Sequence, residues 1–106
     1  MEIYEIKNLN CNKRSNRKKL LNETMNLLNL KEKPSIEDLL LYCKKIKRKY
    51  KIGFKAFPLE DCYQINIEVE RGIQSIMICY TKYEAICKYI LFCNAWIKYK
   101  RMQGKQ

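Results

Sequence analysis

A chain of 106 residues has room for one modest core, so we treat residues 1–106 as a single domain. Hydrophobic residues make up 47% of it, with only three Gly and two Pro, which excludes a disordered or low-complexity chain. Lys and Arg number 22 against 11 Asp and Glu, and the net charge of +11 favours a negatively charged partner: nucleic acid, a nucleoprotein complex or an acidic protein surface.

Neither a membrane-spanning helix nor a secretory signal is predicted. The most apolar stretch, residues 89–97, is about half the roughly 20 residues that a spanning helix needs, and Asn94 interrupts it. The N-terminus lacks an apolar core segment. The six cysteines have wide, irregular spacings, which favours buried thiols in a reducing compartment over a disulfide framework. We therefore expect a cytoplasmic protein with no membrane partner.

The N-terminal region combines a weakly alternating segment with a basic run. Ile3, Tyr4 and Ile6 predict that residues 1–14 form an arm or an edge strand. The basic run of residues 12–19 leads into an apolar stripe that predicts a helix ending near Leu30.

Residues 36–50 predict an amphipathic helix. Ser35 is a suitable N-cap, with Asp38 three residues later. At 100° per residue the apolar side chains share one face of this helix, and lysines and Arg48 cover the other.

Three antiparallel strands are predicted next, at residues 52–57, 63–69 and 73–80. Residues 63–70 alternate apolar and polar side chains, as a half-buried strand does. A two-residue turn at Arg71-Gly72 pairs Glu70 with Ile73, Ile67 with Ile76, Ile65 with Ile78 and Tyr63 with Tyr80. This register collects the large apolar side chains of both strands on one face.

A capping box, Thr81-Lys82-Tyr83-Glu84, opens the longest predicted helix, residues 82–101, and residues 102–106 form a polar tail. This helix is apolar on more than one side, so we expect it to be central. The predicted fold class is α+β, a three-stranded antiparallel sheet packed by helices, in the order (β)-α-α-β-β-β-α.

The residue sets that catalysis and metal binding need are not found in the sequence. The chain has no His, no pair of cysteines two to four residues apart and no Gly-rich phosphate loop. We therefore expect no enzyme activity, no catalytic residue, no metal site and no cofactor.

Two basic groups carry the functional signal of the sequence, and we predict them to bind nucleic acid or an acidic partner. A bound anion would offset the repulsion in either group, although a solvated basic surface has the same composition. A third, weaker group comprises Lys98, Lys100, Arg101 and Lys105. The predicted binding residues are Lys13, Arg14, Arg17, Lys18 and Lys19 at the start of the first long helix, and Lys44, Lys45, Arg48, Lys49 and Lys51 on the second.

The alternative function is a protein-interaction module. Cys87, Leu91 and Tyr99 lie outside the main apolar arc of the last helix, and they would form a homodimer or partner interface there.

Two partial resemblances complete the prediction. The α-β-β-β-α order from residue 35, with Thr81-Lys82-Tyr83-Glu84-Ala85 opening the last helix, resembles the double-stranded-RNA-binding domain in topology. The strand pair followed by Tyr83-Glu84-Ala85 is similar to small accessory proteins of phages and other mobile elements, which include anti-CRISPR inhibitors. This second resemblance implies a non-catalytic inhibitor of a host defence nuclease.

Overall fold

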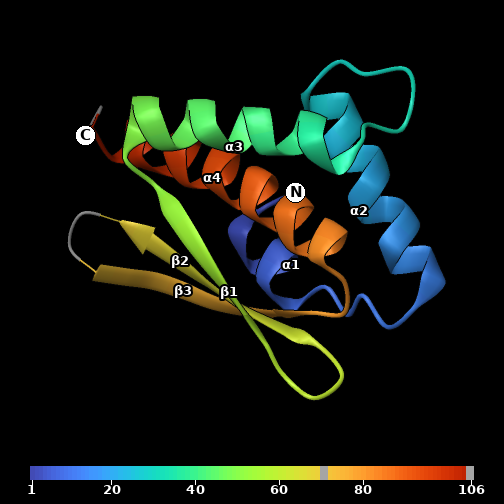
Figure 1. Ribbon diagram of the computed structural model, residues 1–106. Helices are drawn as coiled ribbons and strands as arrows, with labels where there is room; N and C mark the ends of the chain where they lie inside the picture. Colours follow the sequence, from blue (N-terminus) through green and yellow to red (C-terminus); the bar gives the residue numbers. More distant parts are fainter. Residues whose placement is uncertain (70–71, 105–106) are drawn as a thin grey trace.

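The computed structural model describes residues 1–69 and 72–104 (Figure 1). The predicted α+β class is confirmed over these residues, with four helices and three strands. In chain order the elements are α1 (Ile3–Asn8), α2 (Arg14–Leu27), α3 (Ile36–Tyr50), β1 (Gly53–Pro58), β2 (Tyr63–Val69), β3 (Gly72–Cys79) and α4 (Lys82–Gly104).

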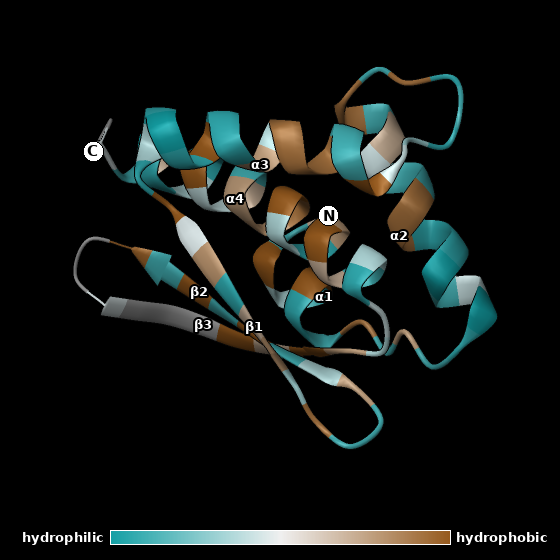
Figure 2. Cartoon of the chain, in the orientation of Figure 1, coloured by the Kyte–Doolittle hydropathy of each residue, from teal (hydrophilic) through white to brown (hydrophobic). Residues whose placement is uncertain are grey.

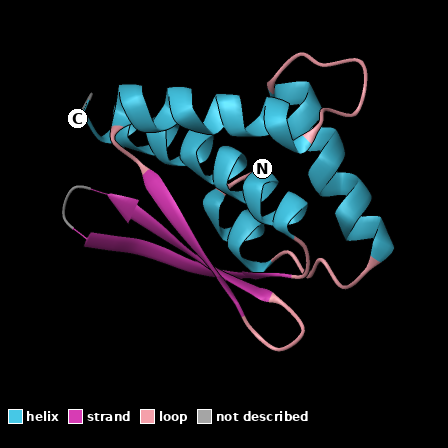
Figure 3. Ribbon diagram, in the orientation of Figure 1, coloured by secondary structure: helices cyan, strands magenta, loops and turns pink. Residues whose placement is uncertain are grey.

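The molecule has two layers, with the helices gathered on one side of the sheet (Figure 3). The sheet is antiparallel in the order β1-β2-β3. Helix α4 lies at the centre and packs against the other three helices and all three strands. Every residue from Glu84 to Cys93 is buried, which explains why this helix is apolar on more than one side. No helix in the described part of the chain is long and apolar enough to cross a membrane.

The N-terminal arm or edge strand predicted for residues 1–14 is wrong. Residues 3–8 form α1, which packs on α4, and the side chain of Ile6 is fully buried. A six-residue helix is too short to be stable alone, so its stability comes from this tertiary contact.

The predicted β2–β3 register is displaced by one residue. Ile65 pairs with Met77 and Tyr63 with Cys79, and the ladder is irregular between Ile67 and Glu68. A shift of one residue exchanges the two faces of a strand. Met77 and Cys79 are therefore buried, and Ile76 and Ile78 are exposed on the outer face, as is Tyr80 just after the strand. The predicted partner Glu70 and the turn residue Arg71 lie outside the described residues.

Both predicted N-caps are formed. The Ser35 hydroxyl accepts a hydrogen bond from the backbone N–H of Asp38, at 3.1 Å. The Thr81 hydroxyl accepts one from the N–H of Glu84, also at 3.1 Å, and the Glu84 carboxylate accepts one from the N–H of Tyr80. Helix α4 continues through residues 102–104, where we predicted a polar tail, and residues 105–106 lie outside the described residues.

All six cysteines are free thiols, and all but the half-buried Cys62 lie in the core. Because an apolar environment disfavours the thiolate, burial raises the pKa of Cys87 to about 11. The same cause raises the pKa of Cys43, Cys79 and Cys93 to about 12. These thiols act as small apolar side chains in the core.

A fully buried lysine, Lys88, connects three parts of the fold. Its ammonium group donates hydrogen bonds to the carbonyl oxygens of Leu9 after α1, at 2.8 Å, and of Ile78 in β3, at 3.2 Å. Glu84 lies four residues earlier on the same face of α4 and is also buried. Lys88 of the central helix is therefore hydrogen-bonded to both the loop after α1 and the edge strand β3.

Candidate nucleic-acid interface

Helices α3 and α4 run in the same direction and end on the same side of the molecule, beside the C-terminus (Figure 1). This arrangement joins the basic group of α3 to the third, weaker group predicted on the last helix. The described cations of both groups are exposed, and Lys105 lies outside the described residues. We call this set the basic end: Lys44, Lys45, Lys47, Arg48, Lys49, Lys51, Lys98, Lys100 and Arg101.

The two chain segments that carry the basic end lack acidic residues. Residues 39–51 and 85–104 contain no Asp or Glu. Ion pairs occur elsewhere: Lys19 lies 3.9 Å from Glu5, and Lys55 lies 3.6 Å from Glu68. Among the described residues, no carboxylate lies within 4.0 Å of a basic-end cation. Hydrophilic residues follow the outward side of the C-terminal half of α3 in Figure 2.

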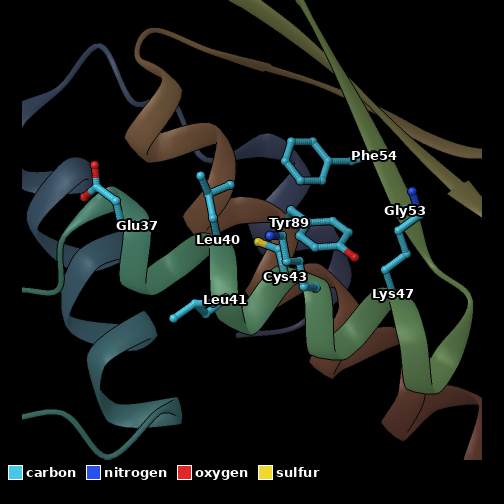
Figure 4. Close-up of a pocket in the computed structure, with 9 residues that line it drawn as sticks. Glu37, Leu40, Leu41, Cys43, Lys47, Gly53, Phe54 and Tyr89 are labelled. Atoms are coloured by element: carbon cyan, nitrogen blue, oxygen red, sulfur yellow. The ribbon is translucent and has the colours of Figure 1, made fainter.

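A groove of about 500 Å³ lies between α3 and β1. Leu40 and Cys43 of α3 line it together with Tyr89 of α4 and with Phe54 of β1, which lies above Tyr89 in the view of Figure 4. The rings of Phe54 and Tyr89 are 4.5 Å apart, and the Tyr89 hydroxyl donates to the carbonyl of Ile52. Two lysines of the basic end, Lys44 and Lys47, line this largely apolar groove together with one carboxylate, that of Glu37.

A second groove, of about 280 Å³, lies on the other side of α3 and is bordered by α2 and α4. We call it the helical groove. Its walls are apolar or aromatic except for one amide, Asn94, and three basic-end cations: Lys45, Lys98 and Arg101. The whole lining set is Leu27, Leu28, Tyr42, Lys45, Ile46, Tyr50, Ile90, Cys93, Asn94, Ile97, Lys98 and Arg101. Helix α3 is therefore a basic ridge with an apolar groove on each side.

Three cations of the basic end lie over aromatic rings. The Lys45 ammonium is 5.5 Å from the centroid of the Tyr42 ring, and the Lys49 ammonium is 5.3 Å from that of Tyr50. The Lys100 ammonium is 5.1 Å from the centroid of the Trp96 ring. Positively charged groups and aromatic rings thus lie side by side on the basic end. This combination is typical of surfaces that bind nucleic acid.

The other predicted basic group lies apart from the basic end. The start of α2 is at the far side of the view in Figure 1 from the ends of α3 and α4. Arg17 donates to the carbonyls of Cys11 and Asn12, and lies 4.0 Å from Glu84. The predicted binding set Lys13, Arg14, Arg17, Lys18 and Lys19 is therefore not brought together with the α3 set, and two of its cations contact carboxylates.

The predicted partner interface on the last helix requires a correction. Cys87 and Leu91 are 1% and 5% exposed, because α1, α2 and α3 cover the sides of α4 on which they lie. Tyr99 is 45% exposed and accepts a hydrogen bond from the amide of Gln103 at 2.6 Å. The expectation that these three residues form one exposed surface is wrong, since two of them belong to the core.

Three residues of the helical groove, Tyr42, Tyr50 and Asn94, were not predicted as site residues. By periodicity Tyr50 belongs to the apolar face of the helix predicted for residues 36–50, and Asn94 interrupts the apolar stretch of residues 89–97. The four- and eight-residue spacing of Tyr42, Ile46 and Tyr50 was the available signal, because it puts them in one row on α3. No group of three Cys, Asp or Glu side chains among the described residues is arranged to hold a metal ion.

No protein-family model matches this chain, and no curated protein or solved structure is detectably similar to it.

Proposed function

We propose that this chain is a non-catalytic binding protein that docks on nucleic acid, alone or in a nucleoprotein complex, through the basic end. The observation that carries the proposal is the parallel packing of α3 and α4, which collects two groups of cations in one place, with no carboxylate of the described residues within 4.0 Å of them. Cations held together in this way repel one another, and a polyanion relieves that repulsion.

The spacing of the α3 cations suits a phosphate backbone. From Lys44 to Lys51 the helix advances about 10 Å, the axial length of about three nucleotides in one strand of a duplex. Lysine and arginine side chains on such a ridge neutralise phosphates and release the counterions around them, so affinity falls as salt rises.

A binder of this kind would act as an accessory or inhibitory factor without chemistry of its own. When such a protein occupies a nucleic-acid strand, other proteins cannot bind that strand. When it occupies the surface of a nuclease that holds the strand, the nucleic acid cannot bind the nuclease. This is the activity that the resemblance to anti-CRISPR and other phage accessory proteins implies, and we include it in the proposal.

The test is fluorescence polarisation with labelled DNA and RNA at about 50 and 200 mM salt. The basic-end variant combines Lys45→Gln, Lys49→Gln and Arg101→Gln. Its matched control combines Lys13→Gln, Arg14→Gln and Lys18→Gln, which removes the same charge from the start of α2. We expect the basic-end variant to lose at least tenfold in affinity at about 50 mM salt, with a shallower salt dependence, and the control to lose less than about threefold.

Two results would contradict the proposal. If the wild-type chain binds neither DNA nor RNA at the lower salt, the partner is not nucleic acid, and an acidic protein surface becomes the candidate. If both triple variants lose the same affinity, binding follows net charge alone and the basic end is not a site.

A further inference from the structure

The helical groove contains one side-chain amide, that of Asn94, which has no hydrogen-bond partner among the described residues. Asn94 lies in the interior of α4, where asparagine is a poor helix former, and it faces a groove whose other uncharged lining residues are leucines, isoleucines, tyrosines and Cys93. No hydrogen bond joins its amide to another described residue. An amide offers two donors and two acceptor positions, so it is suited to a planar ligand that carries both.

The walls of the groove fit such a ligand. Tyr42 and Tyr50 contribute aromatic surface from α3, and Ile90 and Ile97 contribute aliphatic surface from α4. Lys98 and Arg101 add positive charge, and no lining residue is acidic. A volume of about 280 Å³ lies at the small end of ligand sites, too small for a folded partner and suited to one small ring with its substituents.

The geometry points to the helical groove as a site for one unpaired nucleotide of a single-stranded nucleic acid. The base lies between the tyrosines and the aliphatic wall, and its hydrogen-bonding edge faces the Asn94 amide. The phosphates on either side contact Lys45, Lys98 and Arg101. This inference rests on the proposed function and adds to it a preference for single strands.

The strand preference follows from access to the bases. In a duplex the bases are stacked and paired, so a groove between helices meets only phosphates. An unpaired base can leave the strand and stack on an aromatic ring. Lys45 and Lys49 now lie over the Tyr42 and Tyr50 rings. A base that stacks on these rings would displace the two lysine ammonium groups, which would then lie beside the phosphates that flank the base.

The test measures the affinity of the full chain for labelled 12-nucleotide single strands of RNA and DNA and for a 12-base-pair duplex. The variant Asn94→Ala removes the amide, and Asn26→Ala, at an exposed position of α2, is its matched control. We expect Asn94→Ala to lower the affinity for single strands about five- to tenfold and to leave duplex affinity within about twofold. We expect Asn26→Ala to change neither affinity. The melting temperature of Asn94→Ala should equal or exceed that of the wild type, because alanine is the better helix former.

A second variant, Tyr42→Leu, removes a stacking ring and keeps an apolar side chain. We expect it to lower single-strand affinity about tenfold with an unchanged salt dependence, since no cation is lost. Salt-dependent binding with equal affinities for single strands and duplex, insensitive to both variants, would overturn the inference and leave the proposed function standing. Absence of binding to any of the probes would overturn both.

Discussion

The thiols of Cys43, Cys79, Cys87 and Cys93 lie in the core, and burial raises the pKa of Cys87 to about 11 and of the other three to about 12. The sequence indicated this placement, because these cysteines occur where small apolar side chains fit a helix or a strand. The identity of the most exposed cysteine, by contrast, depends on the geometry of a loop and was not predictable. Cys62 follows the end of β1 in a loop, and it is half-buried there.

These thiols make stability depend on pH. Below pH 9 these thiols are protonated in both the folded and the unfolded state, so they do not make stability depend on pH. Above pH 9 they ionise in the unfolded chain, where their pKa is near 9.0, before they ionise in the folded one. The unfolded state then binds fewer protons, and the free energy of unfolding falls by about 1 kcal/mol per thiol between pH 9 and 10.

Urea unfolding in reducing buffer between pH 8 and 10 measures this loss. We expect Cys43→Val to reduce the slope of stability against pH by roughly a fifth, because one of five buried thiols no longer titrates; burial raises the pKa of Cys11 as well. Cys62→Ser, at the half-buried position, is the control and should keep the wild-type slope. A wild-type stability that does not change over this range would contradict the burial of these thiols.

The long elements were predictable from sequence, and the short or ambiguous ones were not. The caps and periodicity of α3 and α4 are local features, so their starts agree with the structure. Helix α1 has no cap bond of its side chains and forms against the core. Residues 76–79 of β3 are apolar on both faces, and no local pattern identifies the buried face. In the structure the face with Met77 and Cys79 is buried, and β3 contacts α1 and α4.

Lys88 provides a test at the level of elements. In Lys88→Met the carbonyls of Leu9 and Ile78 lose their donor, and we expect the free energy of unfolding in urea to fall by about 2 kcal/mol. Hydrogen exchange of the α1 amides should accelerate more than that of α3, since the fastening of α1 is lost. Lys82→Met, at an exposed position of α4, should change stability by less than about 0.5 kcal/mol. A loss equally small for Lys88→Met would show that water replaces the ammonium group at these carbonyls.

At the scale of the whole molecule, the distribution of charge matters more than its total. The sequence showed the individual basic groups and the net charge of +11. It did not show that α3 and α4 end on the same side of the molecule. That depends on how the two helices pack, and in the sequence three strands lie between them. For the same reason the helical groove was not predicted, since its lining residues come from three helices far apart in the sequence.

The concentration of cations at the basic end makes the free protein sensitive to salt. Two exposed cations about 10 Å apart repel each other by about 0.4 kcal/mol in water, and several such pairs add to a strain of about 1 kcal/mol. Raising NaCl from about 10 to 150 mM shortens the screening length from about 30 to 8 Å. At this spacing the shorter screening length removes a little less than half of the repulsion, about 0.4 kcal/mol, so we expect the melting temperature to rise by about 2–3 °C.

The two triple variants show where this repulsion is located. In the basic-end variant (Lys45→Gln, Lys49→Gln, Arg101→Gln) the rise in melting temperature with salt should be about half that of the wild type. In the α2 variant (Lys13→Gln, Arg14→Gln, Lys18→Gln) most of the rise should remain, because Glu5 and Glu84 already offset the positive charge of that region. Equal salt responses in the two variants would mean that the salt dependence of the melting temperature follows the net charge alone. The repulsion would then not be concentrated at the basic end.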